Sequence, residues 1–159
     1  MQNYPGQPWT PDLTPLDDYP YLAKHDPFSS FAGIVRNPER WKCIVDEYQF
    51  WSDVINGQLP NYAWFTPNMW NDGHYVAGTR LPASERAPQL VNQTAAWLQT
   101  LFAALQFPGP HSRLPPHTLV VVTFDEADYE KEYVQDQHDA SSYDGPNQIY
   151  TVLLGDGIP

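Results

Sequence analysis

Apolar residues recur at helical spacing in two stretches of the chain. The first stretch begins at Asn37-Pro38, a capping side chain followed by proline at the first helical position, and it closes at Asn56-Gly57. The second runs from about Pro88 to Gln106 and is followed by a segment rich in proline and glycine. Because each stretch is apolar on one face only, the pattern predicts two helices that each pack one face against a core.

Short apolar runs predict strands at residues 61–66, 118–124 and 148–154. The run 118–124 is so uniformly apolar or β-branched that it is typical of a strand buried on both faces. The order strand, helix, strand, loop, strand favours a layered α/β fold, with a right-handed crossover between the first two strands if they are parallel. We therefore expect a mostly parallel sheet flanked by helices.

We expect the chain to form a single domain. The chain has 159 residues, of which 42% are hydrophobic, and this is enough for a compact core. Residues 1–33 are rich in Pro, Tyr and Asp and show no sustained period, so we expect an extended segment that wraps onto the α/β part formed by residues 34–159.

The composition is strongly acidic, with 19 Asp plus Glu against 8 Lys plus Arg and a net charge of −11. Such a surface repels nucleic acid and attracts divalent cations. No apolar stretch is long enough to cross a membrane, and residues 1–5 lack the basic and apolar regions of a signal peptide. Cys43 is the only cysteine, and the sequon at Asn92 would matter only in a secreted protein. Localisation and oligomeric state stay open.

Two adjacent carboxylates end the apolar run 118–124. Asp125 and Glu126 are hard oxygen donors, and at the end of a strand both can reach one divalent ion. The alternative is that they cap a helix or lie in a solvated turn. Two carboxylates at the rim of a sheet are costly unless something positive meets them, so the pair predicts a metal site.

Histidines supply the second set of candidate groups. His74 follows Gly73, whose backbone freedom lets a tight loop turn the imidazole inward, where it could bind a metal, contact a phosphoryl oxygen or act as a general acid. His25 allows the same roles, and either histidine could equally be a surface residue. If the strands at 61–66 and 118–124 are parallel, their carboxyl ends share one sheet edge, so we expect His74 close to Asp125. No serine lies in a nucleophile motif.

Several blocks of sequence, in order along nearly the whole chain, resemble the phosphoesterase family. They are residues 24–28, 37 onward, 59–69, 71–74, 97–98, 118–126 and 149–159. The family includes fungal and bacterial acid phosphatases and bacterial phospholipases C, and the fungal acid-phosphatase-like branch is the most similar. The resemblance implies an alkaline-phosphatase-like fold and metal-dependent hydrolysis of small phosphate esters through a phospho-enzyme on Ser or Thr.

The resemblance also implies roles for individual residues. Asp125 and Glu126 match the acidic pair that binds the divalent metal, whose identity the sequence leaves open. His25 and His74 match active-site histidines that contact the metal or the phosphoryl group. Asn71-Asp72 belong to the same loop motif as His74 and are weaker candidates.

The chain departs from the family pattern in three places. Tyr75 stands where the family's loop usually has a further Asp, the upstream Glu-Asn metal motif and the nucleophile have no counterpart, and the C-terminal segment with another histidine would follow Pro159. We therefore expect the C-terminal part of a single phosphoesterase domain, a fragment that lacks its nucleophile. The competing hypothesis is a non-catalytic acidic module that binds a cation, or a degenerate homologue.

Overall fold

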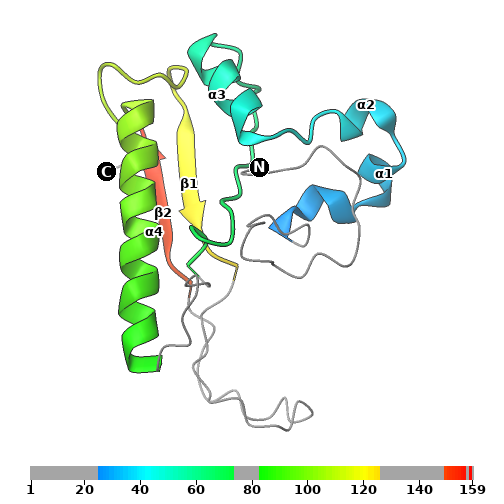
Figure 1. The fold of residues 1–159 in the computed structure, drawn as a ribbon. Coiled ribbons are helices and arrows are strands. Elements are labelled where there is room, and N and C mark those ends of the chain that lie inside the picture. The colour runs from blue at the N-terminus through cyan, green and yellow to red at the C-terminus, as the bar shows by residue number, and fades with distance from the viewer. Residues whose placement is uncertain (1–24, 74–82, 126–148, 157, 159) are drawn as a thin grey trace, which may run out of the picture. The chain divides into compact units, whose positions relative to one another are not determined.

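The computed structural model describes residues 25–73, 83–125, 149–156 and 158, and it divides the chain into two compact units, residues 1–115 and 116–159 (Figure 1). Among its described residues the first unit contains the short 3-10 helix η2 (Pro27–Ser30) and the α-helices α1 (Ala32–Val35), α2 (Pro38–Trp41), α3 (Glu47–Ile55) and α4 (Ala83–Leu105). The second contains the strands β1 (Leu119–Thr123) and β2 (Thr151–Gly155). The fold is thus α/β, as predicted. The part of the expected N-terminal segment before residue 25 lies outside the described residues.

The first predicted helix is two helices. Asn37 caps α2 as expected, since its side chain accepts hydrogen bonds from backbone N–H groups in the first turn. The chain then leaves the helix, and Asp46 caps a new one, α3, by accepting from the N–H of Gln49 at 2.9 Å. Gly57 ends α3 with a φ of 63°, as its position predicts. The predicted ends are confirmed and the predicted continuity is wrong, because Asp46 supplies a second start.

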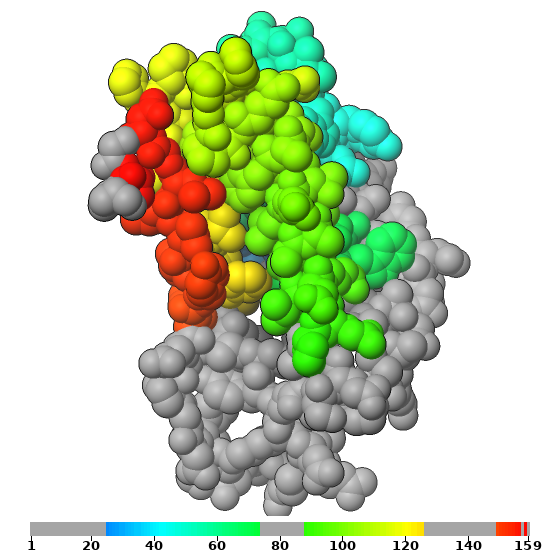
Figure 2. Space-filling view, turned by 90° about the vertical axis from the view of Figure 1, so that its left-hand side faces the viewer, coloured from blue at the N-terminus to red at the C-terminus, as the bar shows by residue number. Residues whose placement is uncertain are grey.

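Helix α4 confirms the second predicted helix and begins earlier, at Ala83 instead of Pro88. On its inner face Leu90 and Leu105 are each 4% exposed, whereas Val91 is 66% exposed. Part of the outer surface of α4 lies open in the space-filling view (Figure 2). The predicted core-facing side is thus confirmed at Leu90 and Leu105, whereas its extension to Val91, which continues the same apolar pattern, is wrong.

Residues 61–66 are not a strand, so that prediction is wrong. The segment is irregular, and among the described residues no strand pairs with it. Its aromatic ring at Phe65 lies 4.8 Å from the ring of Phe50 on α3 and 6.0 Å from the ring of Trp97 on α4, measured between centroids. Of the aromatic residues that resemble a strand in the sequence, Phe65 thus packs between two helices, whereas Tyr62 and Trp64 contact Phe28.

The sheet of the second unit, as far as it is described, is the antiparallel pair of β1 and β2. Thr123 lies opposite Thr151, and their hydroxyl oxygens are 2.8 Å apart. On the same face Leu119 and Val121 are 55% and 51% exposed, so β1 is not buried on both faces as its sequence suggested. The mostly parallel sheet is not confirmed, and the alkaline-phosphatase-like layering stays a prediction.

In the part of the chain that the structure describes, no helix is both long enough and apolar enough to cross a bilayer.

The contrast between neighbouring residues on α4 gives a test of the core. Leu90→Ala leaves a cavity and should lower the free energy of unfolding by about 2–5 kcal/mol in urea denaturation. The matched change Val91→Ala, on the exposed face, should alter it by less than about 0.5 kcal/mol. Equal effects of the two substitutions would contradict the assignment of the buried face.

Candidate functional site

Two segments far apart in the sequence bring candidate residues together in the first unit. The Nδ1 atom of His25 lies 3.8 Å from Oδ2 of Asp72, and their side chains are 26% and 13% exposed. Both residues were singled out by the family resemblance, but nothing in the sequence paired them with each other. At this distance the carboxylate and the imidazole can form an ion pair when the ring is protonated.

Asp26, next to His25, is a buried acid that the sequence analysis missed. Its side chain caps η2, with Oδ1 accepting a hydrogen bond of 3.0 Å from the N–H of Phe28. Only 2% of the residue is exposed, and among the described residues Oδ2 has no hydrogen-bond partner. Burial raises the pKa of this carboxyl group, against the opposing effect of hydrogen bonds from the backbone of Phe28 and Ser29. The signal in the sequence was Asp followed by proline, the signature of a helix start.

Asn68 is a second buried polar residue that the sequence analysis did not select. It is 5% exposed, and its Oδ1 accepts hydrogen bonds from the N–H of Trp70 at 3.2 Å and from the side-chain amide of Asn71 at 2.9 Å. The carbonyl of Asn68 accepts a further bond from the N–H of Asn71. Asn68 therefore holds the turn that leads to Asp72, and its place directly after a proline was the available signal.

The end of this loop has the conformation predicted for it. Gly73 has a φ of 91°, a region that favours glycine over residues with a side chain. The carbonyl of Trp70 accepts a hydrogen bond from the side-chain amide of Gln93, which anchors the loop to α4. His74 itself lies outside the described residues, so its predicted orientation is not tested.

The acidic pair belongs to the second unit. Asp125 is exposed just beyond the end of β1, and Glu126 lies outside the described residues. The argument that put Asp125 beside His74 required a parallel strand at 61–66, and that strand is absent. Their closeness is now an expectation from the family resemblance alone.

A complete metal site is not found within the described residues, because no three His, Cys, Asp or Glu side chains gather there. Asp125 and Asp72 are nevertheless suitable oxygen donors, and His25 is a suitable nitrogen donor. The predicted metal site thus stays a prediction.

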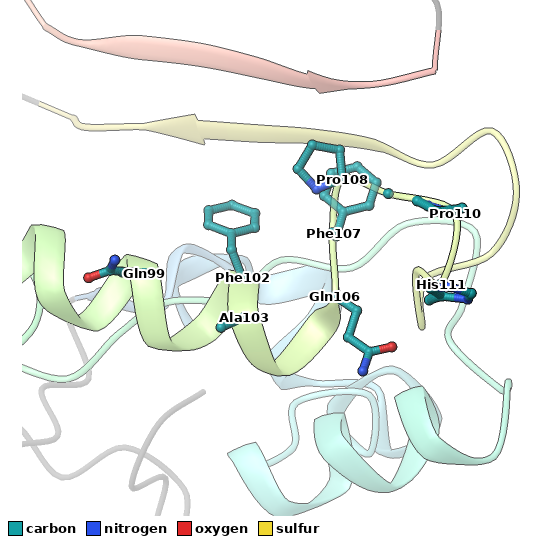
Figure 3. A pocket seen from close by; sticks show the side chains of 9 residues that line it. Gln99, Phe102, Ala103, Gln106, Phe107, Pro108, Pro110 and His111 are labelled. Carbon is teal, nitrogen blue, oxygen red and sulfur yellow. The ribbon is translucent and has the colours of Figure 1, made fainter.

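A hollow of about 610 Å³ lies elsewhere, at the end of α4 (Figure 3). It is lined mainly by apolar side chains, among them Phe102 and Phe107, whose rings stack with centroids 6.4 Å apart. His111 is the only lining residue that can carry a charge. None of the predicted site residues lines this hollow, and it offers no carboxylate for a metal.

Comparison with known proteins identifies the family. The sequence model of the Phosphoesterase family matches residues 15–148, which is most of the chain. The protein therefore belongs to the Phosphoesterase family. The match includes every candidate residue of the site.

Fungal phosphatases are the relatives found. The chain is 30% identical over 139 residues to a protein of Kluyveromyces lactis described as "Probable acid phosphatase", covering 87% of this chain and 26% of that protein. It is 30% identical over 139 residues to the acid phosphatase of Aspergillus fumigatus, with 87% and 25% covered. The phosphate-repressible acid phosphatase of Penicillium chrysogenum is 26% identical over 141 residues, with 87% and 27% covered. The chain thus spans about a quarter of these relatives' length. No solved structure matches it.

The buried carboxyl group of Asp26 predicts a pH-dependent stability. Because burial raises its pKa above the ordinary value of 3.8, ionisation above that pH costs the folded state more than the unfolded state. Asp26→Asn removes the charge and keeps the shape, so the variant should be more stable than the native protein at neutral pH. The gain should shrink to nothing as the pH falls below 3.8, where both states are protonated. Urea denaturation across this range measures it.

The control for this experiment is Asp46→Asn, which changes another helix-capping aspartate that is only half-buried. It should give no comparable gain at neutral pH. If the native protein and the Asp26→Asn variant are equally stable at neutral pH, the buried carboxylate of Asp26 does not destabilise the fold.

Proposed function

We propose that this chain forms part of a metal-dependent phosphoesterase of the acid phosphatase type, which hydrolyses phosphate esters of small molecules. The observation that carries the proposal is the contact between His25 and Asp72, because it joins two motif segments of a chain that belongs to the Phosphoesterase family. The fungal relatives named as acid phosphatases support the substrate class.

In this proposal His25 acts on the phosphoryl group. An imidazole held by a carboxylate can donate a hydrogen bond to a phosphoryl oxygen or protonate the departing alcohol. Asp72 is mostly buried and lies 3.8 Å from the ring, so it limits the ring's orientation. Asn68 fixes the turn that carries Asp72, which makes it a positioning residue.

The metal would be held by Asp125 and Glu126. Asp125 is exposed beyond the end of a strand, where its oxygen atoms are accessible, and the strongly acidic composition favours cation binding. When bound, a divalent ion withdraws electron density from a phosphoryl oxygen. His74, on the family resemblance, is an active-site histidine that contacts the metal or the phosphoryl group.

The nucleophile, in this proposal, comes from sequence that this chain does not contain. No Ser or Thr here lies in the context of the family's nucleophile, and the chain covers about a quarter of its relatives. The chain supplies groups that bind and neutralise the phosphoryl group, and it needs a further segment to form the covalent intermediate.

Cation binding can be tested on the chain itself. Calorimetric titration with Zn²⁺, Mn²⁺, Mg²⁺ and Ca²⁺ should reveal one site, and Asp125→Asn should weaken it about tenfold or more because a charged ligand is lost. Asp156→Asn is the matched control, since Asp156 is exposed at the other end of the same antiparallel pair. Equal loss in the two variants would indicate diffuse attraction of cations to an acidic surface instead of a site.

Activity gives a second test. With 4-nitrophenyl phosphate and added divalent metal, the chain alone should release little nitrophenol above the rate without protein, because the attacking group is missing. Supplying the rest of the domain in a longer protein should restore metal-dependent release, followed by absorbance. Rapid turnover by the chain alone, abolished by Asp125→Ala, would show that the nucleophile is present in it after all.

A further inference from the structure

Three aromatic side chains form an exposed cluster, which we call the aromatic platform: Phe28, Tyr62 and Trp64. The ring of Phe28 meets the ring of Tyr62 edge to face, with centroids 6.5 Å apart and planes at 84°. It meets the ring of Trp64 in the same way, at 6.3 Å and 86°. Tyr62 is 67% exposed and Trp64 is 49% exposed, so much of their ring surface faces water.

Two kinds of contact position the rings of the platform. The indole N–H of Trp64 donates a hydrogen bond of 2.8 Å to the hydroxyl of Thr66, which fixes the plane of the ring and satisfies its one donor. Phe28 is half-buried and holds both neighbouring rings. A preformed aromatic surface loses little conformational entropy when a flat apolar group stacks on it.

The platform and the polar contact of the proposed site are formed by the same two segments of the chain. The backbone N–H of Phe28 donates to Oδ1 of Asp26, whose neighbour His25 contacts Asp72. On the other segment, the chain runs from the platform to Asp72 through the turn held by Asn68. The same two segments, 25–28 and 62–72, thus carry an aromatic contact and a polar contact.

We propose that the aromatic platform binds the organic part of the substrate, and that the substrates preferred by this site are phosphate monoesters of aryl or other flat apolar alcohols. This inference rests on the proposed function, because it places the phosphoryl end at His25 and Asp72. An uncharged ring suits the platform, since the chain's net charge of −11 disfavours further anionic groups on the organic part. A cluster of exposed aromatic rings is also typical of a surface that binds a ligand.

Ligand-observed NMR titrations of the unmodified chain test the preference for aryl phosphates. The added metal is Mg²⁺, because paramagnetic Mn²⁺ would broaden the signals. The probes are inorganic phosphate, glycerol phosphate and phenyl phosphate. Phenyl phosphate should bind more tightly than glycerol phosphate. Trp64→Ala should weaken phenyl phosphate about three- to tenfold through lost stacking and leave the other two affinities unchanged. Tyr62→Ala, at a more exposed position, should act in the same direction without threatening the fold.

The matched control is Tyr48→Ala, which removes a ring that is 78% exposed on α3. It should change none of the three affinities. If all three probes bind but phenyl phosphate binds no more tightly than glycerol phosphate, the platform inference is overturned and the proposed function stands. The same holds if phenyl phosphate binds more tightly but neither Trp64→Ala nor Tyr62→Ala weakens its binding. An equal loss of phenyl phosphate affinity in Tyr48→Ala also overturns it. If none of the three probes binds, the proposed function fails and the inference fails with it.

Discussion

The packing of Phe65 between Phe50 and Trp97 is the constraint on which the first unit depends. It holds one irregular segment between α3 and α4 at its middle. Before Phe65 the chain presents two rings to Phe28, and beyond it the chain turns at Asn68 to reach His25 through Asp72. A loop without regular hydrogen bonding is thus held by side chains on both sides, which allows it to carry a site.

Local signals in the sequence predicted local structure well. The caps at Asn37 and Gly57 follow from interactions within a few residues and are confirmed, and the buried face of α4 is confirmed except at Val91. The break before α3 was missed because Asp46 lies inside an apolar pattern that reads as one helix. The strand at 61–66 was wrong because alternating aromatic residues suit a strand and a spacer between helices equally well.

The site was less predictable, because it depends on contacts between distant segments. The contact of His25 with Asp72 joins two residues that spacing could not pair, and only the family resemblance selected both. Asp26 and Asn68 were missed because their importance lies in burial, which a single polar residue in a loop does not reveal. The expected meeting of Asp125 with His74 was argued from a parallel sheet, and the strands that are described pair antiparallel.

The exposed apolar face of β1 bears on how the protein behaves at high concentration. Leu119 and Val121 lie on that face together with Leu153, and the strand pair, as far as the structure describes it, offers this surface to any other copy that meets it. At neutral pH the net charge of −11 keeps copies apart by mutual repulsion. Near the isoelectric point of 4.5 that repulsion vanishes, so acidity weakens the colloidal protection of the sheet surface.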